Sequence, residues 1–172
     1  SNIYLARDHG GPWQNNIDVE KKVSLKQAML SAKNSFEEDI DNDFSFIHID
    51  TSVDIHKKIN FKNSMDRLYE LYEHCYSYSR RKKKDILFEI GTEEQNGSTN
   101  SFDELHETLN CLSTFCQKNR LPRVTFVVIQ SGTKVIETEN IGSFESPIRI
   151  KNEIPPEIQI FKALELCQKY GV

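Results

Sequence analysis

The sequence predicts an α/β fold on parallel strands, with about four central βα units of a (β/α)8 barrel. Four short apolar runs are each followed by a polar or glycine-bearing turn and then by a segment with helical periodicity. The turn markers Asp8, Asp50, Gly91 and Gln130 are separated by 42, 41 and 39 residues. Such regular alternation predicts parallel pairing with right-handed crossovers.

Each expected strand is a near-continuous apolar run, which is typical of strands buried on both faces. The runs are Ile3–Ala6, Phe44–Ile49, Ile86–Ile90 and Val124–Ile129. A closed barrel needs about 250 residues, whereas this chain has 172. Four parallel strands alone leave two apolar edges bare. We therefore expect one α/β domain over residues 1–172, part of a barrel, that forms an oligomer or pairs with a partner.

The segments between the strands carry helix signals. Ser24 and Gln27 form a capping-box pattern at the start of the first. Its apolar stripe is Leu25, Ala28, Met29, Ala32 and Phe36. A second stripe is Phe61, Met65, Leu68, Tyr72 and Cys75. A further S-x-x-E cap begins at Ser101, and Pro155-Pro156 is expected to start a last helix that ends at Gly171.

Composition and charge exclude several classes of protein. With 22 Lys and Arg against 26 Asp and Glu, the net charge is −4, so we expect no nucleic-acid partner. No stretch approaches the roughly 20 apolar residues of a membrane span, so we expect neither a membrane partner nor a signal peptide. The four cysteines form no C-x-x-C pair. This pattern predicts reduced core thiols in a cytoplasmic protein.

Polar residues gather where the expected strands end, which is where parallel α/β folds bind ligands. They include Asp8, His9, Asp50, Glu93, Glu94 and Gln130. His9 and Glu93 suit a divalent metal such as zinc, and we predict them as its ligands. Asp8 and Asp50 are the predicted catalytic residues, because carboxylates can exchange protons beside a carbonyl. Gln130 is predicted to bind a polyhydroxy substrate.

Each of these residues also has a structural interpretation. Asp8 would then cap the Gly10–Gly11 turn and His9 would bond a backbone carbonyl, with no metal present, since no second histidine follows at a later strand end. His48 lies in mid-strand and is interpreted as a hydrogen-bonded structural histidine. Trp13 either shapes a loop over a sugar or anchors that loop.

Four segments together carry a family resemblance. They are Ile3–Gln14 (IYLARDHGGPWQ), Phe46–Ser52 (FIHIDTS), Glu89–Glu93 (EIGTE) and Val127–Gly132 (VVIQSG). They resemble the non-catalytic (Z) subunits of tagatose-bisphosphate aldolase, whose pattern reads GGDHLGP, HLDAS, IGTE and VVQPG in the same order. That family has a class II aldolase-like (β/α)8 barrel. The resemblance covers essentially this whole chain and the middle of the longer family chain, which implies central barrel strands.

The first of these turns differs from the family pattern. Ala6 and Arg7 replace glycines, and the loop is shorter around Trp13. These changes alter the pocket wall, and we predict that Arg7 and Trp13 bind substrate. The Asp8-His9 pair also resembles the Asp-His-Gly turn of class II fructose-bisphosphate aldolases. That resemblance implies proton transfer by Asp8 and zinc binding by His9.

The family resemblance implies a carbohydrate-metabolism protein that binds a sugar phosphate at the strand ends. By this resemblance it would stabilise a separate catalytic class II aldolase subunit. The alternative is a metal-dependent ketose epimerase or aldolase active in its own right, with His9 and Glu93 on the metal. A third is a degenerate barrel with an interaction role alone. The sequence leaves the sugar and the metal open.

Overall fold

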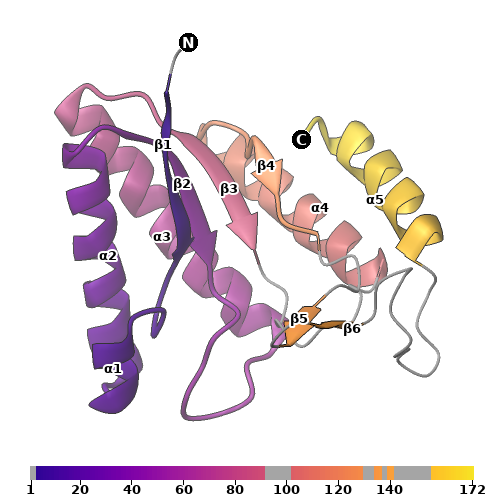
Figure 1. The fold of residues 1–172 in the computed structure, drawn as a ribbon. Coiled ribbons are helices and arrows are strands. Elements are labelled where there is room, and N and C mark those ends of the chain that lie inside the picture. The colour runs from indigo at the N-terminus through magenta and orange to yellow at the C-terminus, as the bar shows by residue number, and fades with distance from the viewer. Residues whose placement is uncertain (1–2, 92–101, 130–133, 137–138, 142–155) are drawn as a thin grey trace.

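The structure is a computed structural model of the chain (Figure 1), and it describes residues 3–91, 102–129, 134–136, 139–141 and 156–172. The elements in chain order are β1 (Leu5–Gly10), α1 (Asn16–Glu20), α2 (Leu25–Asp41), β2 (Phe44–Asp50), α3 (Phe61–Lys82), β3 (Leu87–Gly91), α4 (Phe102–Asn119), β4 (Phe126–Val127), β5 (Lys134–Ile136), β6 (Glu139–Ile141) and α5 (Pro156–Tyr170).

The first four strands form one sheet in the order β1-β2-β3-β4, and every neighbouring pair is parallel. This confirms the α/β class and the predicted strand order, whereas the closed (β/α)8 barrel stays a prediction. The first strand differs from the expected Ile3–Ala6. Because its pairing with β2 continues, β1 extends to Gly10 through residues that were expected to form a turn. The antiparallel pair β5–β6 was not predicted.

The helices begin where the capping signals place them. Ser24 caps α2, and its side chain and that of Gln27 form both bonds of the capping box. The last helix starts at Pro156 and is followed by Gly171 with a left-handed φ of 71°. Among the helices that the structure describes, none combines the length and the apolar character needed to cross a membrane.

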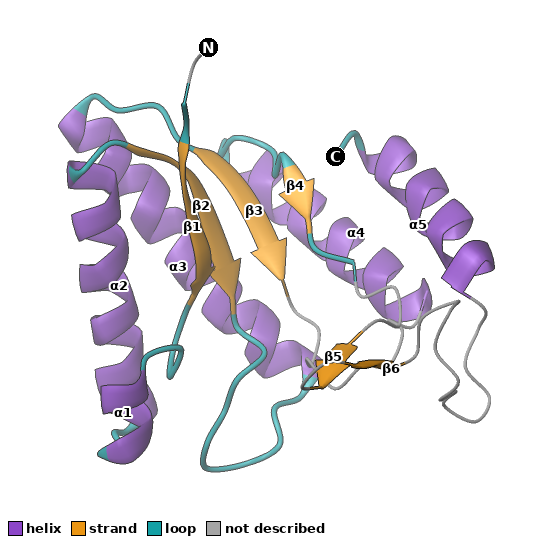
Figure 2. Ribbon diagram, in the orientation of Figure 1, coloured by secondary structure: helices purple, strands orange, loops and turns teal. Residues whose placement is uncertain are grey.

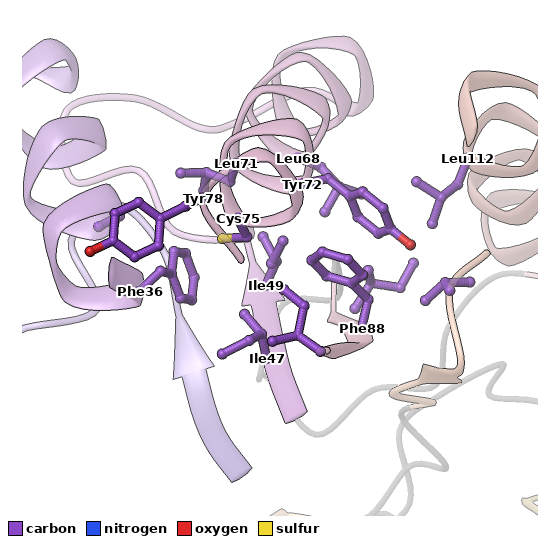
Figure 3. Packing of buried hydrophobic residues seen from close by; sticks show 14 of the residues in the cluster. Phe36, Ile47, Ile49, Leu68, Leu71, Tyr72, Cys75, Tyr78, Phe88 and Leu112 are labelled. Carbon is purple, nitrogen blue, oxygen red and sulfur yellow. The ribbon is translucent and has the colours of Figure 1, made fainter. Parts of the chain in front are cut away.

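The hydrophobic core lies between the helices and one face of the sheet (Figures 2 and 3). Ile47 and Ile49 of β2 and Phe88 of β3 point toward this side and are fully buried. Tyr72 of α3 stacks on Phe88 with 3.8 Å between the ring centroids. Burying one such side chain contributes about 1.5–3 kcal/mol. The core therefore fixes which face of each strand is turned toward the helices.

The alternate residues of the strands lie on the other face of the sheet. Aromatic side chains meet there across three segments, with ring centroids 5.9 Å apart for Tyr4 and Phe46 and 5.7 Å apart for Phe46 and Phe126. Tyr4, Leu87 and Phe126 are each more than 40% exposed. This second face is thus apolar at the level of Phe46, and it becomes polar toward the carboxyl end of β2, where His48 and Asp50 follow.

Candidate functional site

A β-bulge in β1 shapes the candidate site. Arg7 pairs with Ile47 and Gly10 pairs with Ile49, so β1 advances by one residue more than β2 between these two pairs. Within the bulge, His9 has a left-handed φ of 46°, which is uncommon for a residue other than glycine. Bulges redirect side chains and are frequent beside functional sites.

The bulge brings two consecutive side chains to one histidine. In a regular strand Asp8 and His9 would point to opposite faces of the sheet. Here Asp8 Oδ1 lies 4.0 Å from His48 Nδ1, and the rings of His9 and His48 have centroids 4.8 Å apart. Asp8 Oδ1 also lies 3.6 Å from His9 Nε2. The three residues thus form one group beside the carboxyl end of β2.

This Asp8–His9–His48 group could hold a metal ion. One ligand atom from each residue lies within 4.8 Å of the other two. Two imidazoles and a carboxylate are ligands that suit zinc and similar ions. Three protein ligands with an open fourth position are the arrangement of catalytic zinc sites rather than structural ones. Asp8 is 90% exposed, so the group is accessible from solvent.

His48 is buried yet incompletely bonded. Its Nδ1 receives a long hydrogen bond of 3.4 Å from the backbone N–H of His9, and its Nε2 has no partner within the described part of the chain. Burial lowers the pKa of His48, and the nearby Glu89 carboxylate opposes this only in part. The imidazole is therefore neutral near pH 7, which is the form that binds metals.

Asp50 contacts the Asp8–His9–His48 group through the ring of His9. Its carboxylate is nearly fully buried, and Oδ2 lies 2.9 Å from His9 Nδ1. The same oxygen accepts a hydrogen bond from Gln14 Nε2 at 2.8 Å, while Oδ1 accepts one from the backbone N–H of Ser52 at 2.9 Å. One ring nitrogen of His9 therefore contacts a carboxylate.

Glycine permits this close approach of β1 and β2. A Cβ atom on Gly11 would lie 1.8 Å from the carbonyl oxygen of Asp50. A Cβ on Gly10 would lie 2.3 Å from the ring of Phe36. Both distances are far below van der Waals contact. Without a side chain at these two positions, the loop after β1 can rest directly on the end of β2 and keep His9 beside Asp50.

Glu89 of β3 extends the polar row to a third strand. It is the register partner of His48, and its Oε2 lies 3.9 Å from His48 Nδ1. Sequence reasoning missed both Glu89 and the role of His48. A signal was present, since His48 precedes Asp50 by two residues and Glu89 precedes Gly91 by two. The period of two puts each of them on the same sheet face as its strand end.

Two predicted substrate-binding residues lie apart from the group. Arg7 forms an ion pair of 2.5 Å with Asp39 of α2, so its guanidinium contacts a helix rather than the Asp8–His9–His48 group. Trp13 is 3% exposed, and its indole N–H donates to the carbonyl oxygen of Val23 at 3.0 Å. The guanidinium of Arg67 lies 5.3 Å from its ring. These contacts match the anchoring role that the sequence held open for Trp13.

Glu93 and Gln130 lie outside the described residues, so their metal-binding and substrate-binding roles stay predictions. The strands that precede them do end at the same edge of the sheet. Gly91 at the end of β3 is the register partner of Asp50, and the backbone N–H of Val128 donates to the carbonyl of Ile90. The common strand-end edge expected from the sequence is therefore present through β3.

Comparisons with known proteins bear on the fold. No family model matches the chain, and no curated protein matches it. A crystal structure of a probable tagatose 6 phosphate kinase from Sinorhizobium meliloti is similar over 97% of this chain, with a TM-score of 0.70 and 17% identity. This chain spans 38% of that protein's length. A 7,8-dihydropteroate synthase from Vibrio fischeri matches 85% of this chain and 51% of its own, with a TM-score of 0.38 and 14% identity. The first similarity shows a shared α/β fold.

Proposed function

We propose that this chain belongs to a metal-dependent carbohydrate enzyme of the aldolase or ketose-epimerase type. The observation that carries the proposal is the Asp8–His9–His48 group, assembled by a β-bulge where parallel strands end. Enzymes on parallel α/β sheets bind ligands at that edge. The sugar-phosphate substrate class is supported by the structural neighbour, a probable tagatose 6 phosphate kinase.

The group suits chemistry at a sugar carbonyl. A divalent ion held by Asp8, His9 and His48 would supply Lewis-acid polarisation of a carbonyl or hydroxyl oxygen. The chain itself supplies carboxylates for moving protons. Glu89 is one such carboxylate: its side chain is one-third exposed beside His48, so it can exchange a proton with a bound sugar. His48 is held neutral by burial, which favours ligation over protonation.

Metal binding and turnover test this proposal together. We expect the chain to bind about one Zn²⁺ or Co²⁺ in calorimetric titrations. His9→Ala and His48→Ala should each weaken that binding by at least about a hundredfold, since each removes a direct ligand. His106→Ala is the matched control, because His106 is an exposed histidine on α4. The same variants are assayed with a panel of ketose phosphates.

The titrations have an outcome that contradicts the proposal. If the parent chain binds neither ion at micromolar concentration, or if both site variants bind as the parent does, the group is no metal site. Loss of turnover in His9→Ala and His48→Ala, with turnover retained in His106→Ala, is the result expected of an enzyme.

A supporting subunit of a class II aldolase is the second candidate, and one observation favours it. Tyr4, Leu87 and Phe126 expose apolar surface on the sheet face opposite the core helices. A surface of this kind fits association with another protein. In this case the chain alone has no turnover, and adding it raises the melting temperature of a class II aldolase. No change in that temperature, with turnover by the chain alone, excludes this candidate.

A further inference from the structure

The buried carboxylate of Asp50 is held by three separate parts of the chain. His9 belongs to the bulge in β1, Gln14 to the loop that follows it, and Ser52 to the segment after β2. Each places a nitrogen within 2.9 Å of one of the two carboxylate oxygens. The side chain of Asp50 is 4% exposed. This burial, with donors on both oxygens, argues against direct contact between Asp50 and a substrate.

The donors around Asp50 determine which nitrogen of His9 carries hydrogen. A backbone N–H and a side-chain amide nitrogen can only donate, so Ser52 and Gln14 require both oxygens of Asp50 to accept. A carboxylate engaged in this way is an acceptor alone. The third contact, from His9 Nδ1, must therefore be an N–H that donates to Oδ2.

We infer that Asp50 is a positioning residue that holds His9 in the tautomer protonated at Nδ1 and directs its Nε2 lone pair toward Asp8 and His48. The inference rests on the proposed metal site, and it assigns Asp50 a role other than the proton transfer predicted from the sequence. His9 Nε2 is the nitrogen that lies 3.6 Å from Asp8 Oδ1, on the side of the metal-binding group. A carboxylate behind a ligating histidine fixes the ring and raises its affinity for the metal.

Asp50 also stabilises the strained backbone conformation of His9. A left-handed φ of 46° at a residue with a side chain costs free energy and persists only where the surroundings hold it. The bond to Asp50 ties the end of the strained bulge to β2. Asp50 thus fixes the position of the imidazole as well as its tautomer.

The tautomer can be measured without metal or substrate. Two-bond ¹H–¹⁵N spectra of the metal-free chain, recorded at a pH where the His9 ring carries a single proton, should show that proton on Nδ1 and none on Nε2, with the signals assigned by their absence in His9→Ala. A singly protonated His9 ring that carries its proton on Nε2 overturns the inference. This measurement decides the matter even if an Asp50 variant fails to fold.

The Asp50→Asn variant tests the positioning role itself. The asparagine oxygen can still accept from Ser52, which turns the amide NH₂ toward His9 and should shift the ring to the Nε2-protonated tautomer. Zn²⁺ affinity should then fall about 10–100-fold. Asp41→Asn, the same substitution at the far end of α2, should change neither value.

The two proposals fail in different ways. If the parent binds no Zn²⁺ yet shows the Nδ1 tautomer, which Asp50→Asn reverses, the metal site is wrong and the pairing of Asp50 with His9 is right. If Zn²⁺ binds and Asp50→Asn leaves both the tautomer and the affinity unchanged, the positioning role is wrong.

Discussion

Gly11→Ala tests whether the contact between the β1 loop and β2 builds the candidate site. The added Cβ would lie 1.8 Å from the carbonyl oxygen of Asp50, where ordinary contact begins at 3.4 Å. The two backbones would have to separate by about 1.6 Å to relieve the overlap. The 2.9 Å bond between His9 and Asp50 tolerates only about 0.6 Å of stretching before it is lost. The substitution should therefore break that bond.

The energetic cost follows from the same geometry. Overpacking typically costs about 1–3 kcal/mol, and this overlap is with backbone, which cannot rotate away as a side chain can. Losing a hydrogen bond to a buried carboxylate adds to that cost, since such bonds contribute about 1.5–3 kcal/mol. Because the two effects share the same atoms and do not add fully, we expect the free energy of unfolding to fall by about 3–5 kcal/mol.

Urea unfolding followed by tryptophan fluorescence measures this loss. Trp13 is the single tryptophan of the chain and lies two residues from the substitution, in a buried position. Gly171→Ala is the control, because its Cβ would meet its nearest neighbour at 3.7 Å and its left-handed backbone should cost about 1–2 kcal/mol. If Gly11→Ala unfolds within about 0.5 kcal/mol of the parent and binds Zn²⁺ equally well, the close approach does not build the site.

Two further predictions concern the ion pair between Arg67 and Asp54, which lies next to Trp13. Arg67→Met removes the partner of the buried Asp54 carboxylate and should lower the free energy of unfolding, measured in urea, by about 3 kcal/mol. The control Lys62→Met breaks an exposed ion pair with Asp66 and should change that free energy by less than about 0.5 kcal/mol. Equal losses in the two variants would contradict the prediction. Burial raises the pKa of Asp54, but hydrogen bonds from Arg67 and from the His56 backbone outweigh it and leave that pKa below its ordinary 3.8. This stabilisation is thus complete above pH 3.8 and is lost as pH falls through the lowered folded-state pKa, so Asp54→Asn should flatten the acid side of the stability curve.

Local signals in the sequence were sufficient for the α/β class and for most element positions. The Ser24 cap and the start of α5 at Pro156 depend on residues within one helical turn, so they can be read without knowing the tertiary structure. Parallel strand order follows from the alternation of strands and helices. These features are set by neighbours in the chain.

The geometry of the site depends on contacts between distant residues. The bulge at His9 arises from the register in which β1 pairs with β2, and no residue type within β1 predicts that register. His48 became part of the group because Ile47 and Ile49 face the helices and leave it on the opposite side. The prediction of a catalytic Asp50 placed that residue at the correct strand end, but its partners Gln14 and Ser52 come from segments brought together by folding.

The bulge also means that the Asp8–His9–His48 group is encoded by the number of residues in β1 as well as by their types. Deleting one residue between Arg7 and Gly10 would make β1 and β2 advance equally between the Arg7–Ile47 and Gly10–Ile49 pairs, while the other register shift, between Leu5 and Ala6, would remain. The remaining polar side chains would then alternate between the two faces, and the group would be dispersed. Substitution libraries never sample this change. Variation in chain length at this one position is therefore a sharper probe of the site than variation in residue identity.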